Sequence, residues 1–117
     1  MSVFIASGES LEMREVPGIP NLDLKDVFED IEGTRASAGK SIAGKGGWRV
    51  DNWNYNYDEL QYIIKGTETL EFEGKTLVAH GGDFIQIQKG TIVTQTCEEG
   101  TELIFITIPS LKTLGII

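Results

Sequence analysis

The chain has 117 residues, 40% of them hydrophobic, which suits one compact domain and leaves no room for a second domain of ordinary size. Acidic residues outnumber basic ones by 18 to 10, and the net charge of −8 disfavours binding to nucleic-acid phosphates. No apolar run approaches the roughly 20 residues of a membrane helix, and the N-terminus lacks a secretion signal, so we expect neither membrane nor nucleic-acid binding.

Residues 1–22 are mixed in character and contain a bend at Pro17–Pro20. Beyond them, apolar residues recur at helical spacing at Leu24, Val27, Phe28 and Ile31, with acids on the other face. This pattern predicts a short helix or helical turn that ends at Gly33.

Residues 33–50 contain five glycines, four basic residues and no acid. We interpret this stretch as a solvated face or an edge strand protected by charge. The alternative is a contact site for an anionic ligand or an acidic partner. A phosphate-binding loop is rejected, because five residues separate Gly33 from Gly39 where that motif requires four.

From about Trp48 onward the sequence predicts short strands separated by turns. The turns fall every 8–12 residues or so, a spacing typical of an antiparallel sandwich or barrel. No strand–helix–strand rhythm and no internal repeat is present. The expected strands are residues 60–64, 67–72, 76–78, 84–88, 92–97 and 103–108.

The segment Tyr57–Gly66 resembles the first motif of the cupin superfamily, in which a glutamate lies seven residues before a strand-ending glycine. Here those residues are Glu59 and Gly66. Residues 82–90 are similar to the second motif, with Gln88 where cupins usually have proline. Within the superfamily, Trp53, residues 57–59 and residues 23–27 resemble the ethanolamine-utilisation EutQ type, a likeness that covers roughly residues 20–109.

This resemblance implies an all-β fold, the cupin jelly-roll barrel or double-stranded β-helix, with a short N-terminal arm or helix. We expect a single domain over residues 1–117, with an arm at 1–22, the barrel at 23–109 and a tail at 110–117. Such barrels pair through an edge strand or a swapped arm, so we expect a homodimer. The resemblance also allows association with a microcompartment. Kinase activity has been attached to the EutQ family, but the sequence offers no independent support for nucleotide binding.

Cupin enzymes hold a metal with two histidines two residues apart, a glutamate and a third histidine. The matching positions here are Trp53, Tyr55, Glu59 and Val93. Only Glu59 is a good ligand, so we expect no catalytic metal and no cofactor. A shifted alignment would place Asn52 and Asn54 in the first two positions, where amide oxygens suit Ca²⁺ or Mg²⁺.

Polar and aromatic residues predict a site inside the barrel. Alternation along a regular strand places Tyr55, Tyr57 and Glu59 on one face, as candidate catalytic residues. The residues expected to line the pocket with them are Trp53, Tyr62, Gln86, Gln88 and Thr94. A buried carboxylate among tyrosines has a raised pKa and can act as general acid or base. The alternative is a hydrogen-bonded structural glutamate in a vestigial site.

The lone histidine and the lone cysteine are interpreted as structural. His80 lies at a predicted turn, which favours an exposed residue over a catalytic base. Cys97 excludes an internal disulfide, fits a reducing cytoplasm, and is expected to be a small core residue.

The sequence leaves the function open between classes. We expect an accessory or small-molecule-binding protein, with an unknown small molecule in the barrel. The alternative is a metal-independent isomerase or lyase that uses Glu59 and the tyrosines for proton transfer.

Overall fold

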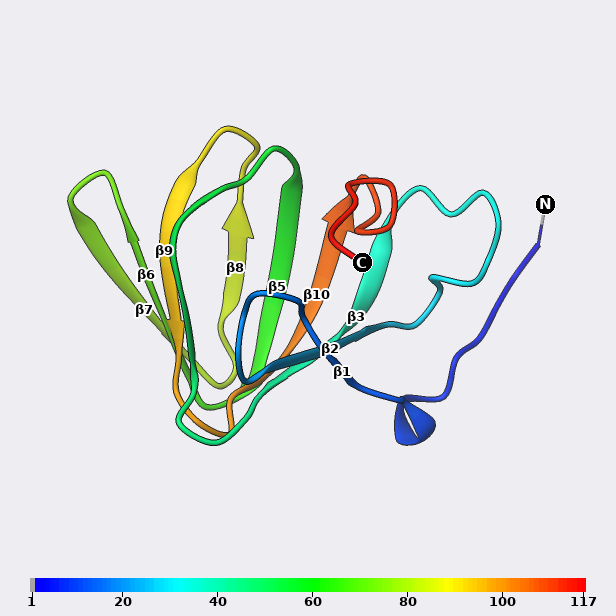
Figure 1. Cartoon of the computed structure of the whole chain (residues 1–117), viewed down its shortest axis with the longest axis horizontal. Coiled ribbons are helices and arrows are strands. Elements are labelled where there is room, and N and C mark those ends of the chain that lie inside the picture. The colour runs from blue at the N-terminus through cyan, green and yellow to red at the C-terminus, as the bar shows by residue number, and fades with distance from the viewer. Residues whose placement is uncertain (1) are drawn as a thin grey trace.

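The structure is a computed structural model and describes residues 2–117. It is all-β, with two antiparallel sheets that enclose a common interior (Figure 1). The first sheet has the strand order β1-β2-β3-β10-β5-β8, formed by Arg14–Glu15, Leu22–Asp26, Ser37–Ala43, Glu102–Ile108, Asp58–Lys65 and Phe84–Ile87. The second has the order β4-β9-β6-β7, formed by Trp48–Asn54, Ile92–Cys97, Thr67–Phe72 and Lys75–His80. The strands expected from residue 60 onward are confirmed.

The helix expected from Leu24 to Ile31 is wrong. The first part of this stretch is β2, which pairs antiparallel with β3, and turns follow it. Ladder hydrogen bonds to β3 satisfy the backbone of β2, so tertiary pairing overrides a spacing that also suits a helix. Within residues 2–117 the regular helical structure is a single 3₁₀ turn, η1 (Gly8–Ser10), and no helix is long and apolar enough to cross a membrane.

The basic stretch of residues 33–50 contributes an interior strand, β3, and the start of β4, an edge strand of the second sheet. Strand β3 has β2 on one side and β10 on the other. Its Lys40 forms an ion pair with Glu102 (3.6 Å), and Arg49 in β4 forms one with Asp51 (2.9 Å). Acids of the same chain therefore balance two of the four basic residues of the stretch, while Arg35 and Lys45 are exposed.

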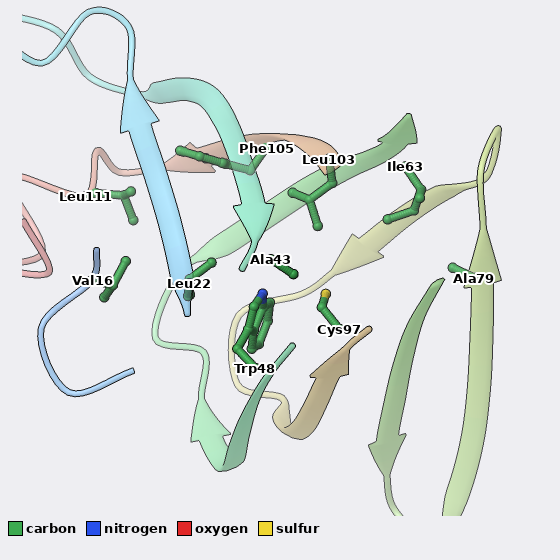
Figure 2. Packing of buried hydrophobic residues seen from close by; sticks show 10 residues of the cluster. All are labelled: Val16, Leu22, Ala43, Trp48, Ile63, Ala79, Cys97, Leu103, Phe105 and Leu111. Carbon is green, nitrogen blue, oxygen red and sulfur yellow. The ribbon is translucent and has the colours of Figure 1, made fainter. Parts of the chain in front are cut away.

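The apolar core lies between the two sheets, and ten buried side chains form its larger cluster (Figure 2). Trp48 and Cys97 lie side by side within it, as register partners on β4 and β9. Cys97 is 1% exposed and burial raises the pKa of its thiol, so it is the core residue that the sequence predicted. His80 is exposed at the end of β7, as expected.

The segments expected to flank the barrel contribute to its interior. Val16 of the N-terminal arm and Leu111 of the C-terminal tail are buried in the core cluster. The tail is anchored where the Leu111 N–H donates to the Ser37 hydroxyl (2.8 Å), which donates to Asp26 (2.6 Å). The arm and the tail therefore close one side of the space between the sheets.

Candidate functional site

A β-bulge in β4 decides which side chains reach the interior. The pairing of β4 with β9 shifts register between Val50 and Trp53, and Asn52 lies there with a φ of +49°. Before the bulge Trp48 and Val50 face inward, and after it Trp53 and Tyr55 do. Because of the extra residue, the side chains that face inward are even-numbered before the bulge and odd-numbered after it. Bulges commonly redirect side chains in this way.

Thr94 holds this bulge in place. Its Oγ1 accepts a hydrogen bond from the Asn52 N–H (3.1 Å), so its hydroxyl is directed to the β4 backbone. The side chains of Asn52 and Asn54 are exposed, whereas Glu59 is buried. The shifted alignment, which would make the two asparagines metal ligands, therefore does not bring them together with Glu59 in one site. Thr94 therefore supports β4, the strand that leads into the segment with both tyrosines.

Tyr55, Tyr57 and Glu59 come together on the buried side of the chain. Both tyrosines are 3% exposed and Glu59 is 8% exposed. The two rings lie 5.1 Å apart at a tilt of 53°, and the Trp53 indole N–H donates to the Tyr57 hydroxyl (3.1 Å). The neighbouring Gln61 amide donates to the Glu59 carboxylate. These contacts leave Glu59 in a largely aromatic setting with one polar neighbour.

These side chains line a cavity of about 90 Å³ between the sheets. Its polar part includes Glu59, Gln61, Gln95 and Ser41. The apolar part comes from the arm, β2, β10 and the tail, through Val16, Ile19, Leu22, Leu24, Leu103, Phe105, Leu111 and Ile116. A mostly apolar lining with a few convergent polar groups is usual for small-molecule sites, and this cavity is smaller than their usual range of about 300–1,000 Å³.

A second buried carboxylate, Glu68 of β6, lies behind this cavity. The Tyr55 hydroxyl donates to Gln95 Oε1 (2.6 Å), and Gln95 Nε2 donates to Glu68 Oε1 (3.0 Å). Glu68 is fully buried, and its Oε2 has no hydrogen-bond partner in the described part of the chain. Gln95 thus connects Tyr55 to Glu68 across the interior.

The sequence analysis missed Gln61, Gln95 and Glu68. A signal for the first two was present, because the strand period of two places Gln61 on the face of Glu59 and Gln95 on that of Val93. Glu68 stands in an alternating stretch in which the apolar residues Leu70 and Phe72 share its face. That alternation identifies the face but not a buried carboxylate on it.

Burial changes the acid–base properties of both carboxyl groups. Desolvation raises the pKa of Glu59 to about 7, against the opposing effect of the Gln61 hydrogen bond. Desolvation, followed by repulsion from Glu59, raises the pKa of Glu68 to about 8. The pKa values of Tyr55 and Tyr57 are raised by burial and by Glu59, so both hydroxyls stay protonated. Glu59 is therefore the interior group whose charge changes nearest to neutral pH.

We expect the protein to lose stability as the pH rises from about 5 to 8. Both carboxyl groups have a higher pKa when folded than the usual 4.5, so the folded state holds protons that the unfolded state releases. At about 1.4 kcal/mol per pKa unit, Glu59 alone should lower the free energy of unfolding by about 3 kcal/mol across this window. Urea unfolding at several pH values measures the effect. The double variant Glu59→Gln/Glu68→Gln should show a flatter profile, and equal slopes would contradict the expectation.

Four of the five predicted pocket residues lie outside the cavity: Thr94, whose hydroxyl is directed at the β4 backbone, and three others. Tyr62 is on the opposite face of β5 from Glu59, where its ring packs against exposed Phe84 at 4.8 Å. Gln86 and Gln88 are exposed and border a separate, wider cleft of about 650 Å³ beside β7 and β8. Ile87, which lies between the two glutamines, is the inward residue. The two glutamines do share a face, but it is the one turned away from Glu59.

The residues at the usual cupin metal-ligand positions do not fit a transition metal. The Trp53 indole offers an N–H directed at Tyr57, and Val93 has no donor atom. Tyr55 keeps its proton, so Glu59 is left as the one suitable ligand of this set. In residues 2–117 no group of three His, Cys, Asp or Glu side chains comes together to hold a metal ion. We therefore derive no chemistry through a metal.

Comparison with known proteins assigns the family. Residues 22–112, most of the chain, match the family described as "Ethanolamine utilisation protein EutQ". The chain is a member of the EutQ family. Over 86 residues it is 32% identical to the acetate kinase EutQ of Clostridioides difficile, covering 74% of this chain and 53% of that protein. Over 58 residues it is 28% identical to the acetate kinase EutQ of Escherichia coli, covering 50% of this chain and 25% of that one. This EutQ-family chain thus spans about half or less of the length of these relatives.

Solved structures confirm the cupin fold. The Clostridium difficile EutQ protein superposes with a TM-score of 0.63 at 29% identity, covering 76% of this chain and 63% of that one. An RmlC-like cupin from Shewanella frigidimarina reaches a TM-score of 0.76 at 18% identity, covering 97% and 96%. KdgF from Halomonas sp. also reaches 0.76, at 16% identity, covering 92% and 94%. The EutQ-type resemblance and the all-β cupin fold expected from the sequence are both confirmed.

Proposed function

We propose that this EutQ-family cupin binds a small molecule in its interior cavity and does so without a histidine-based metal site. The observation that carries the proposal is the buried cavity in which Glu59, Tyr55 and Tyr57 converge. A titratable group with a strongly shifted pKa in an apolar cavity is a physical marker of a functional site.

The charge of the cavity can be compared with the acetate kinase activity that the names of the relatives state. Acetate kinases act on anions, acetate and phosphate compounds. The cavity lining described here includes Glu59 and no Lys, Arg or His. A carboxylate in a poorly solvated space repels an anion, so this cavity is not suited to those substrates. We therefore propose ligand binding, rather than phosphoryl transfer, for this site.

Filling the cavity tests the proposal. In Ser41→Leu the new side chain occupies part of the cavity, because Ser41 lines it from β3. A ligand found by a thermal-shift screen at about 100 times its Kd should stabilise the wild type by about 2.7 kcal/mol and leave Ser41→Leu unchanged. Ala38→Leu, on the opposite face of the same strand, is the matched control and should keep the ligand effect. Equal stabilisation of Ser41→Leu and the wild type would place the ligand elsewhere.

A second candidate function is metal-independent proton transfer, as in an isomerase or lyase. It is favoured by the pKa of Glu59 near 7, which suits a general acid or base at neutral pH. Both tyrosines keep their protons, and the Tyr57 hydroxyl would donate to a substrate oxygen, whereas the Tyr55 hydroxyl donates to Gln95. Loss of a pH-dependent rate in Glu59→Gln would support this function, and unchanged activity would exclude it.

A further inference from the structure

Four donors around the cavity already have acceptors within the protein, whereas the Tyr57 hydroxyl, which also lines it, donates to no group among residues 2–117. The Tyr55 hydroxyl is directed at Gln95, the Gln95 amide at Glu68 and the Gln61 amide at Glu59. The Trp53 indole N–H is directed at Tyr57. Each of these donors therefore serves the protein's own network.

Two buried acceptor atoms, in contrast, have no hydrogen-bond partner in the described part of the chain. Gln61 Oε1 and Glu68 Oε2 are buried and have no hydrogen-bond partner among residues 2–117. Gln61 is 7% exposed and lines the cavity. The third such atom, the Thr107 hydroxyl, can donate as well as accept and is not part of the lining. An unpaired buried acceptor destabilises the protein, and a ligand that brings N–H donors would relieve this.

The charge in the interior points to the same kind of ligand. Glu59 and Glu68 are close enough for Glu59 to raise the pKa of Glu68. The described lining of the cavity holds no basic side chain to balance them. A positive charge supplied by a ligand would let Glu59 ionise without an uncompensated buried charge.

The size and walls of the cavity limit the ligand. About 90 Å³ is three times the share of one water molecule in the liquid, so the ligand has on the order of a few heavy atoms. The tilted rings of Tyr55 and Tyr57 offer π faces that attract cations, and the aliphatic side chains of the lining suit a short carbon chain.

We infer that the cavity binds a small primary ammonium ion with a short aliphatic chain, whose N–H groups are donated to Glu59 and Gln61 Oε1. This inference rests on the proposed function, because it names the ligand class of the same cavity. An ammonium group carries three N–H donors and one charge, which matches a site with surplus acceptors and no cation of its own.

Calorimetric titration of the full chain with probes of similar size and different charge tests the inference. The probes are propylammonium and 2-aminoethanol as cations, 1-propanol as a neutral molecule, and acetate as an anion. At pH 8 we expect both cations to bind at least about tenfold more tightly than propanol, and acetate not to bind. Cation affinity should fall as the pH drops below about 7, because Glu59 becomes protonated while Tyr55 and Tyr57 stay neutral and Glu68 is already largely protonated.

The outcomes separate this inference from the proposed function. If propanol or acetate binds as tightly as the cations and Ser41→Leu removes that binding, the cavity is a ligand site but not an ammonium site. If the cations bind wild type and Ser41→Leu equally, they lie outside the cavity and the inference fails. It also fails if neither cation binds at about 10 mM.

Discussion

Replacing Glu59 with glutamine is expected to weaken the binding of a small ammonium ligand by about 100-fold or more. The variant keeps the shape of the side chain and removes the charge that the ligand would pair with. Truncating one partner of a buried, hydrogen-bonded charge pair costs about 2–5 kcal/mol, which corresponds to that loss of affinity.

The same variant should be more stable than the wild type at pH 8 when no ligand is present. Glutamine carries no charge that must be desolvated, whereas ionised Glu59 does. Titration calorimetry at pH 8 and urea unfolding measure the two effects. Glu71→Gln is the matched control, because Glu71 is an exposed carboxylate of β6 and the variant changes the net charge equally. An affinity unchanged by Glu59→Gln and equally unchanged by the control would contradict a role for Glu59 in binding.

Replacing Gly39 with alanine should lower the free energy of unfolding by about 3 kcal/mol, near the upper end for overpacking. Gly39 lies in the middle of β3, opposite Asp26 on β2 and Phe105 on β10. A methyl group there would meet the backbone carbonyl of Lys25 and come within 2.7 Å of the Phe105 ring. The carbonyl belongs to a paired strand and cannot move without breaking the ladder.

Urea unfolding monitored by tryptophan fluorescence measures this loss. Gly8→Ala is the matched control, because a methyl group at Gly8 meets no atom within 4 Å and needs no unusual φ. We expect that variant to differ from the wild type by less than about 0.5 kcal/mol. A Gly39→Ala protein as stable as the control would show that β2 and Phe105 shift apart at little cost.

The expected effects of Glu59 and Gly39 arise from the same feature, an interior shared by polar and apolar side chains. Phe105 packs over Gly39 and also lines the cavity that contains Glu59. Displacement of this ring would therefore change the shape of the cavity as well as the packing. Ligand binding by Gly39→Ala is for that reason expected to be weaker even in the folded fraction.

Most of the fold could be predicted from the sequence. Short alternating segments between glycine-containing turns predict antiparallel strands, and the segments from residue 60 onward became β5 to β10. Tyr55, Tyr57 and Glu59 were predicted to share a face of one regular strand, whereas both tyrosines lie in the bent connection between β4 and β5 and Glu59 lies in β5; their burial brings the three together. The spacing of Glu59 and Gly66 was specific enough to indicate the superfamily.

What the sequence could not determine depended on contacts between distant segments. Strand β2 forms because β3 pairs with it, although its own spacing also suits a helix. The bulge at Asn52 depends on Thr94, which lies 42 residues away. A local pattern does not report the strand pairing that shifts its own register.

The sequence by itself therefore determined the class of fold and the family motif, and it identified the tyrosines and Glu59 as candidates. All of these follow from local alternation and turn residues. The tertiary structure alone decided that Gln61, Gln95 and Glu68 join them and that Tyr62, Gln86 and Gln88 do not. The sequence pattern around a polar strand residue is the same whether its side chain faces water or the other sheet. Only the packing of the two sheets determines which face is buried.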